Sequence, residues 1–146
     1  MIILAATPIG NLGDASPRLR EALQSADIIA AEDTRTTKHL LSALGVQTSA
    51  QFVALHDHNE DAKSAELVAQ AANCTLVVVS DAGMPGISDP GFALVREAAA
   101  QGVFVTVIPG PSAVLTAVAL SGFPTDRFAF EGFVPRKGRA GYFQAL

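Results

Sequence analysis

The chain has 146 residues, which is long enough for one domain with a sizeable core. Its net charge of −4 argues against binding nucleic acid through clustered cations, without excluding it. No apolar run approaches the roughly 20 residues of a membrane helix, and a lone cysteine, Cys74, rules out a disulfide framework or a cysteine-based zinc site. These totals predict a soluble, cytoplasmic protein that does not enter a membrane.

Five short apolar runs alternate with amphipathic helical patterns along the chain. Strands are expected at residues 2–7, 27–31, 52–56, 75–80 and 103–108. Continuous apolar runs of this length are typical of strands buried on both faces, as in a parallel sheet. Helices are expected between and after them, at residues 16–26, 34–45, 59–72, 89–102 and 111–122. The alternation predicts an α/β fold: an open, doubly wound, mainly parallel five-stranded sheet with helices on both faces.

Residue types at the helix ends predict how the helices begin. Ser16 followed by Pro17 is typical of an N-cap and a first helical position, and Asn59 and Asp89 are expected to cap the third and fourth helices. The fifth helix, 111–122, is apolar nearly all round and is therefore expected to be buried. The residues expected on the inward face of the third helix are Ala65, Val68, Ala69 and Ala72.

The alternation of strands and helices changes after residue 122. An aromatic, turn-rich segment follows, with a basic cluster at residues 136–139 and the start of a helical pattern at 140–146. We expect residues 1–122 to form an N-terminal α/β domain. Residues 123–146 are expected to be a linker and the start of a second α/β domain that continues beyond Leu146.

Most of the unusual residues lie in the loops that follow the five strands. These loops are TPIGNLGD, AEDTRT, HDHNED, SDAGMPGISDPG and IPGPSA. In open α/β sheets, ligands bind outside the carboxyl ends of the strands, so the pattern predicts one site at that edge. The chain has neither a Walker loop nor a G-x-G-x-x-G fingerprint after its first strand, which disfavours nucleotide hydrolysis and leaves a pyrophosphate cradle only weakly supported.

In order and spacing, six motifs resemble the ribosomal RNA small-subunit methyltransferase I family, a branch of the tetrapyrrole methylase-like enzymes. The motifs are TPIGNLGD, AAEDTRTT, LHDHNE, SDAGMPGISDPG, IPGPSA and FEGFVPRK, and they span nearly the whole chain. The resemblance implies S-adenosylmethionine as the methyl donor and the 2′-hydroxyl of a cytidine in 16S rRNA of the small ribosomal subunit as the acceptor. It also implies a homodimer. Because the positive sulfur already activates the methyl group, no metal is required.

The resemblance also implies that the methyl donor lies between two domains, against the proline- and glycine-rich loops. Where the family often has Thr, Met84 places a larger side chain on the pocket wall. The residues expected to bind the methyl donor are Pro8, Ile9, Gly10, Asn11, Asp81, Gly83, Met84, Pro85, Ile87, Ser88, Ser112 and Ala113.

Methyl transfer to a ribose hydroxyl requires an in-line arrangement and removal of the hydroxyl proton. Asp33, His56 and Glu60 are candidates for the base or the orienting group, and Arg35 is a candidate for holding an RNA phosphate. Structural interpretations stay open beside these roles. Asp33 or Thr34 would cap a helix, with Arg35 paired to Glu32, and His56 would pack at the end of a strand.

Other functions also stay open at this point. A metal site is disfavoured, because His56 and His58 would point to opposite faces of an extended segment and no third ligand cluster is evident. A tetrapyrrole or diphthine-type methylase would share the fold and the methyl donor but not the acceptor. A chain that holds half of the pocket for the methyl donor would, by itself, be a non-catalytic module that binds a ligand or dimerises.

Overall fold

The computed structural model describes all 146 residues and divides them into two compact units, residues 1–113 and 114–146. The first unit contains a single sheet with strand order β3-β2-β4-β1-β5, and every neighbouring pair is parallel. The predicted fold class is therefore confirmed. The strands are β1 (Ile2–Ala5), β2 (Ile28–Ala31), β3 (Gln51–Ala54), β4 (Leu76–Val79) and β5 (Val105–Ile108).

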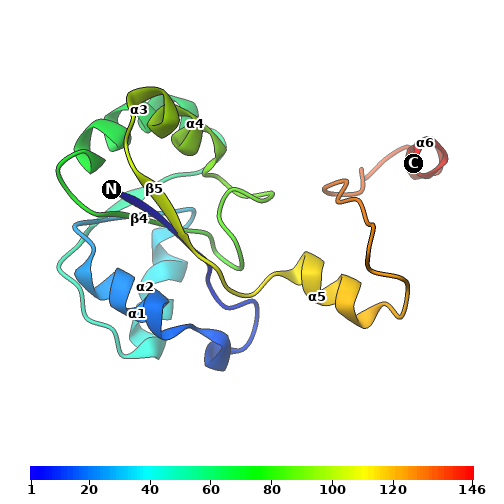
Figure 1. Ribbon diagram of the computed structural model, residues 1–146, viewed down its shortest axis with the longest axis horizontal. Coiled ribbons are helices and arrows are strands. Elements are labelled where there is room, and N and C mark those ends of the chain that lie inside the picture. Colours follow the sequence, from blue (N-terminus) through cyan, green and yellow to red (C-terminus); the bar gives the residue numbers. More distant parts are fainter. The chain divides into compact units, whose positions relative to one another are not determined.

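Helices cover both faces of this sheet (Figure 1). Two of them, α1 (Pro17–Ser25) and α2 (Thr34–Leu44), pack on one face, and α3 (Glu60–Ala71) and α4 (Phe92–Gln101) pack on the other. A short 3₁₀ helix, Leu12–Asp14, precedes α1. Each pair of helices has its own hydrophobic core against the sheet, so the fold is doubly wound as predicted.

The sequence of the central strand β4 is continuously apolar because both of its faces are buried. All four of its residues are buried. Leu76 and Val78 belong to the core under α3 and α4, whereas Val77 and Val79 belong to the core under α1 and α2. Since full burial of a Val or Leu side chain is worth about 1.5–3 kcal/mol, both faces of the strand contribute to stability and neither tolerates a polar residue.

Helix α1 follows its sequence signals closely. The Oγ of Ser16 accepts a hydrogen bond from the Leu19 amide at 3.0 Å, and Pro17 occupies the first helical position. The expected inward face of α3 is wrong by about one position, because Ala65 and Ala69 are exposed. Alanines fit either side of a helix, whereas Leu67 anchors the true face. The buried residues of α3 are Ser64, Leu67, Val68 and Ala71.

Two of the predicted caps are wrong. Helix α4 begins at Phe92 with Gly91 as its N-cap, so Asp89 lies before the helix and does not cap it. Asn59 precedes α3, but its side chain makes no capping hydrogen bond there. At α4 the Glu60 carboxylate takes the place of the local cap, whereas the Asn59 side chain bonds to His56 and Ala54 within its own stretch of chain.

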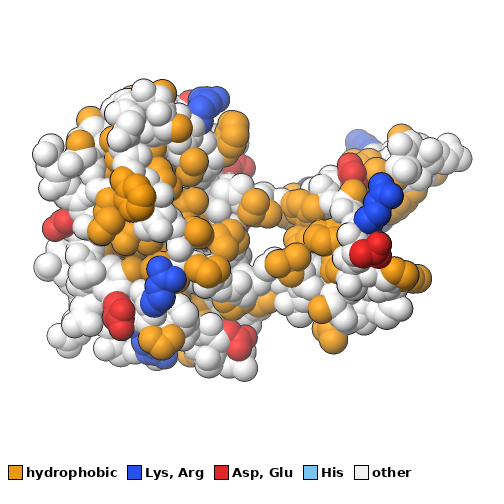
Figure 2. Space-filling model, viewed as in Figure 1, with side chains coloured by type: hydrophobic (Ala, Val, Ile, Leu, Met, Phe, Trp, Pro, Cys, Tyr) orange, Lys and Arg blue, Asp and Glu red, His pale blue; other side chains and the backbone are white.

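The second unit contains helix α6 (Arg139–Ala145) and most of α5 (Ala113–Leu120). No residue of α5 is buried, which contradicts the prediction, since this unit has no strand against which an apolar helix could pack. Figure 2 shows apolar side chains on its surface. The exposed apolar residues of this unit include Leu120, Phe123 and Phe133. The predicted domain boundary near residue 123 stays a prediction. No helix of the chain is both long and apolar enough to cross a bilayer.

Candidate functional site

The site lies where the loop after β4 separates from the loops of its neighbours. In the sheet, β4 lies between β2 and β1. The chain leaves β1 and β2 toward helices on one face, and leaves β4 toward α4 on the opposite face. Loops that diverge in this way open a crevice at the carboxyl ends of the strands, which is the usual ligand site of such sheets.

A set of hydrogen bonds joins the loops after β1 and β4 at the base of this crevice. The Thr7 amide donates to the Gly83 carbonyl at 2.9 Å, and the Gly83 amide donates to the Thr7 carbonyl at 3.2 Å. The buried hydroxyls of Thr7 and Ser80 donate to the carbonyls of Ser80 and Gly83, at 3.3 and 3.2 Å. Sequence analysis missed Thr7 and Ser80, although a hydroxyl residue at the end of each strand was a visible signal.

Gly83 brings a third loop to the same place. A Cβ atom at Gly83 would lie 3.4 Å from the Ile9 side chain and 3.7 Å from the Pro111 carbonyl. Gly110 is also tightly packed, since a Cβ atom there would lie 2.9 Å from the Cβ of Ala6. The loops that carry Pro8 to Asn11, Gly83 to Ser88, and Ser112 with Ala113 therefore start from one compact junction.

The loop from residue 83 to residue 91 has an unusual backbone. Gly83, Gly86 and Gly91 have φ values of 92°, 82° and 141°, and Ser88 has φ of 59°. The loop folds back on itself, with the Gly86 amide donating to the Pro90 carbonyl at 3.1 Å. A positive φ is uncommon for a residue with a side chain and is found at functional sites, so Ser88 marks this loop as more than a connection.

The Glu60 carboxylate holds the far end of the same loop. Its Oε1 accepts hydrogen bonds from the amides of Gly91 and Ala93, both at 2.7 Å, and from the Leu94 amide at 3.4 Å. Glu60 therefore caps α4 from the first residue of α3, in the place where Asp89 was expected. Its charge is stabilised by the positive end of the α4 dipole.

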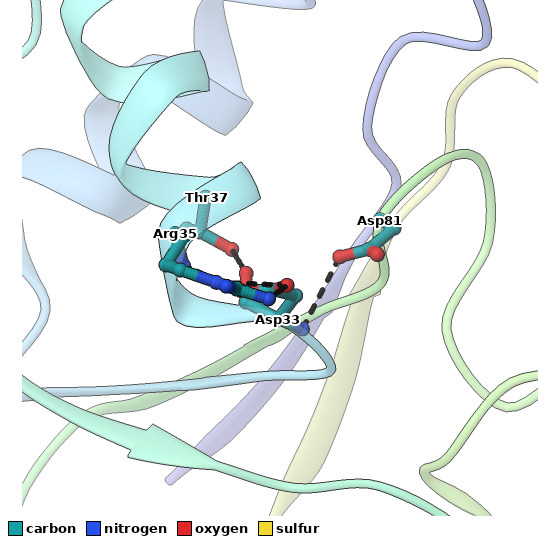
Figure 3. A network of polar contacts seen from close by, with 4 residues as sticks. All are labelled: Asp33, Arg35, Thr37 and Asp81. Atoms are coloured by element: carbon teal, nitrogen blue, oxygen red, sulfur yellow. Dashed lines mark hydrogen bonds and ion pairs between the residues drawn. The ribbon is translucent and has the colours of Figure 1, made fainter.

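Asp33, Arg35 and Asp81 form the polar network shown in Figure 3. The Asp33 carboxylate accepts hydrogen bonds from the Arg35 amide at 2.8 Å and from the Arg35 guanidinium at 2.6 Å. These bonds lower the pKa of Asp33 to about 2. The Asp33 amide donates to Oδ1 of Asp81 at 3.2 Å. Arg35 thus pairs with Asp33 and not with Glu32, and its side chain remains 85% exposed.

His56 belongs to the next loop and is fixed by Asn59. The Asn59 Oδ1 accepts from the His56 amide at 2.9 Å, while its Nδ2 donates to the Ala54 carbonyl at 3.1 Å and faces the His56 Nε2 at 3.2 Å. A neutral His56 must therefore accept at Nε2 and carry its proton on Nδ1. That Nδ1 atom is buried and has no hydrogen-bond partner in the chain.

Carboxylates gather at this edge of the sheet without an equal number of cations. Burial raises the pKa of Glu32, and the nearby charges of Asp81 and Asp89 raise it further. Burial likewise raises the pKa of Asp89, with a smaller contribution from Asp81. An environment that makes carboxylates harder to ionise favours a bound cation, because a positive charge would relieve the repulsion.

A pocket of about 310 Å³ lies between the loop after β1 and helix α2. Three predicted residues, Pro8, Gly10 and Asp81, line it. The remaining predicted residues do not: Ile87, for example, is 54% exposed on the loop after β4, and Asn11 caps the short 3₁₀ helix. The lining residues that sequence analysis missed are Thr7, Leu12, Thr36, His39, Leu40 and Ala43.

Comparison with known proteins identifies the family of the chain. Proteins named ribosomal RNA small subunit methyltransferase I are 50% identical over 94% of the chain in Xylella fastidiosa, 50% over 95% in Mycobacterium tuberculosis, and 47% over 94% in Escherichia coli O157:H7. The matched part is 50%, 49% and 48% of those proteins, so the chain spans about half the length of these curated relatives.

Two further matches concern the fold and the family. The structure of a cobalamin synthesis related protein, CobF from Corynebacterium diphtheriae, superposes with a TM-score of 0.56 at 20% identity, covering 87% of this chain and 60% of that one. At that identity the match shows the fold alone. Residues 1–142 match the family described as Tetrapyrrole (Corrin/Porphyrin) Methylases. A match over nearly the whole chain shows that the protein belongs to the tetrapyrrole methylase family.

Proposed function

We propose that the protein of which this chain is a part transfers a methyl group from S-adenosylmethionine to the 2′-hydroxyl of a cytidine in 16S rRNA of the small ribosomal subunit. The observation that carries the proposal is identity of about 50%, sustained over 94–95% of the chain, to proteins named for methylation of small-subunit ribosomal RNA. The protein is proposed to work in the cytoplasm as a homodimer.

The loops that meet at Gly83 fit this methyl donor. They offer backbone groups and small side chains at one junction, which suits close contact with a nucleoside. The excess of carboxylates around Glu32, Asp81 and Asp89 suits a sulfonium cation. Once bound, the methyl donor supplies an activated methyl group, and the chain supplies the position and the surroundings. The residues proposed to hold it are Pro8, Ile9, Gly10, Asn11, Asp81, Gly83, Met84, Pro85, Ile87, Ser88, Ser112 and Ala113.

Of the three residues proposed as catalytic, Arg35 has the clearest role. Asp33 holds one edge of the guanidinium, and the side chain is otherwise exposed. An arginine fixed in this way presents its remaining N–H groups to an RNA phosphate. Asp33, with a pKa of about 2, is a weak proton acceptor and is proposed to orient Arg35. His56 accepts from Asn59 and is proposed to position its loop.

The direct test uses the full-length protein, S-adenosylmethionine with a labelled methyl group, and small ribosomal subunits from cells that lack the gene. The expected product, after digestion of the RNA to nucleosides, is labelled 2′-O-methylcytidine. Binding of S-adenosylmethionine is measured separately by calorimetry. If the methyl donor binds but neither subunits nor free RNA are labelled, the acceptor is a small molecule and the tetrapyrrole-type alternative takes precedence.

The role of Arg35 has its own test. Replacing it with alanine is expected to raise the KM for the subunit and to reduce the slope of log affinity against log salt by about one, as loss of one phosphate contact does. The affinity for S-adenosylmethionine is expected to stay the same. Arg96→Ala is the matched control, because Arg96 forms a similar exposed ion pair with Asp61 on the opposite face of the sheet. Equal effects of the two changes would contradict a specific contact.

A further inference from the structure

The two units of the chain carry charges of opposite sign. Residues 1–113 contain twelve acidic and six basic side chains, a net charge of −6, whereas residues 114–146 contain two acidic and four basic ones, a net charge of +2. Three of these four cations, Arg136, Lys137 and Arg139, lie within four consecutive positions. A polyanion is repelled by the charge of the first unit and attracted by this short segment. The overall charge of −4 is therefore a poor guide to how the segment interacts with an anion.

None of the three cations is neutralised within the chain. The two ion pairs of the chain both lie in the first unit, and the side chains of Arg136, Lys137 and Arg139 are exposed. Like charges this close together repel one another. A ligand with several adjacent negative charges relieves that repulsion, because each cation can then pair with its own anionic group.

The cations lie on a loop that is closed at its base, which we call the cationic loop (residues 131–142). The Tyr142 hydroxyl donates a hydrogen bond to the Glu131 carbonyl at 3.3 Å, and the Tyr142 amide donates to the Gly138 carbonyl at 3.1 Å. Gly132 and Gly138 both have φ of 73°, a left-handed conformation that turns the chain on either side of the basic residues. The three cations are therefore presented together on one short, closed stretch of chain.

Arg139 is oriented within this loop. Its Nε donates to the Pro135 carbonyl at 3.4 Å, and its two Nη groups form no hydrogen bond within the chain. A guanidinium held at Nε can still bind two phosphate oxygens through its Nη groups. The ring of Pro135 restricts the backbone next to Arg136, which lowers the entropy lost when the loop binds a ligand.

We propose that the cationic loop binds the phosphate backbone of the ribosomal RNA through Arg136, Lys137 and Arg139. The inference rests on the proposed function and adds to the phosphate contact proposed for Arg35; none of the three residues is among those proposed to hold the methyl donor. An RNA strand suits neighbouring cations because every nucleotide brings a phosphate. Such contacts position a nucleic acid without distinguishing its bases, so the cationic loop supplies affinity and not the choice of nucleotide.

The test removes the three charges from the full-length protein by the triple change Arg136→Gln, Lys137→Gln and Arg139→Gln. The affinity for small ribosomal subunits from cells that lack the gene is measured over a range of salt concentrations. Each phosphate contact contributes about 0.7–0.9 to the slope of log affinity against log salt. The slope is therefore expected to fall by about 2–3, and the affinity at 0.1 M salt by about 100-fold. The affinity for S-adenosylmethionine is expected to stay within threefold.

The matched control removes three exposed cations from the first unit, through Arg18→Gln, Lys38→Gln and Arg96→Gln. It lowers the net charge by the same amount, so it reports the effect of overall charge alone. Its slope is expected to change by less than about one, the value for a single phosphate contact.

The proposal is overturned if the two triple variants bind subunits with the same slope while the wild type yields 2′-O-methylcytidine, because the proposed function then stands without the cationic loop. It is also overturned if the full-length protein binds vesicles of phosphatidylglycerol and phosphatidylcholine as tightly as subunits, since the partner is then a lipid surface. Subunit binding that depends on the three cations, with no labelled nucleoside, supports the cationic loop and contradicts the proposed function alone.

Discussion

The contact between Glu60 and the start of α4 gives a prediction with a magnitude. Glu60→Ala removes the acceptor for the Gly91 and Ala93 amides, each now bonded at 2.7 Å. A hydrogen bond to a charged group contributes about 1.5–3 kcal/mol, so two would give about 3–6 kcal/mol. Because Glu60 is partly exposed, water replaces some of this loss, and we expect α4 to become easier to open by about 2–3 kcal/mol.

Amide hydrogen exchange of the full-length protein measures this loss where it occurs. A change of about 2–3 kcal/mol corresponds to a loss of protection of about 30- to 150-fold in the segment 86–101. Glu60→Gln keeps a neutral acceptor and should lose about 1 kcal/mol, or roughly fivefold. The control is Glu66→Ala, on the same helix, whose carboxylate contacts only the exposed Gln70 side chain.

This reasoning is refuted if Glu60→Ala lowers the exchange protection of residues 86–101 no more than Glu66→Ala does. A positive result has a functional consequence, because residues 83–91 form the loop proposed to hold the methyl donor. Glu60→Ala should then weaken S-adenosylmethionine binding in parallel with the lost protection, and Glu60→Gln should recover most of that binding. A general loss of stability would not give this rescue in one loop alone.

Two further predictions concern stability. The bonds to Arg35 lower the pKa of Asp33 to about 2. The stabilising effect of the Asp33 carboxylate is therefore present above its unfolded pKa of about 4 and is lost as the pH falls toward 2. In melting temperatures measured from pH 6 to pH 2, Asp33→Asn should be less stable than the wild type near pH 6 and should converge with it near pH 2. Gly110→Ala would place a Cβ 2.9 Å from that of Ala6 and should cost about 1–3 kcal/mol in urea unfolding, whereas Gly141→Ala, with no atom within 4 Å, should be neutral or slightly stabilising; equal effects would contradict the packing argument.

Periodicity predicted the parts of the fold in which burial alone decides. The continuous apolar run of β4 indicated a strand covered on both faces, and its side chains do alternate between two cores. The start of α1 was predicted correctly because Ser16 followed by Pro17 leaves little choice. Helix α3 was harder, since alanine suits both sides of a helix and a small serine, Ser64, is buried once its hydroxyl donates to the Glu60 carbonyl at 2.7 Å.

The place of the site was predictable from topology, but its contacts were not. Ligands bind at the carboxyl ends of such strands, and the distinctive loops do follow those ends. The bond from the Asp33 amide to Asp81 joins residues 48 positions apart, and the bond from Gly91 to Glu60 spans 31 positions. No local pattern encodes such pairs. The cap predicted at Asp89 failed because the Glu60 carboxylate accepts from the amides at the start of α4. The cap predicted at Asn59 failed because its side chain bonds to His56 and Ala54 at the preceding strand end.

Hydrogen bonds within the chain distinguish residues that position the site from residues whose polar atoms are available to a ligand. The Oδ1 and Nδ2 atoms of Asn59 both form hydrogen bonds within the chain, and Oε1 of Glu60 accepts from the Gly91 amide at the start of α4. Both residues belong to the motif HDHNE, whose residue types are typical of catalytic sites. Their contacts instead hold loops in place. Asp33 holds Arg35 through bonds from the Arg35 amide and guanidinium, and it holds Asp81 through one bond from its own amide. Both Arg35 and Asp81 keep side-chain polar atoms that bond to nothing else in the chain. A group that is fixed by the fold and still incompletely bonded is suited to a ligand, because binding then costs little ordering entropy.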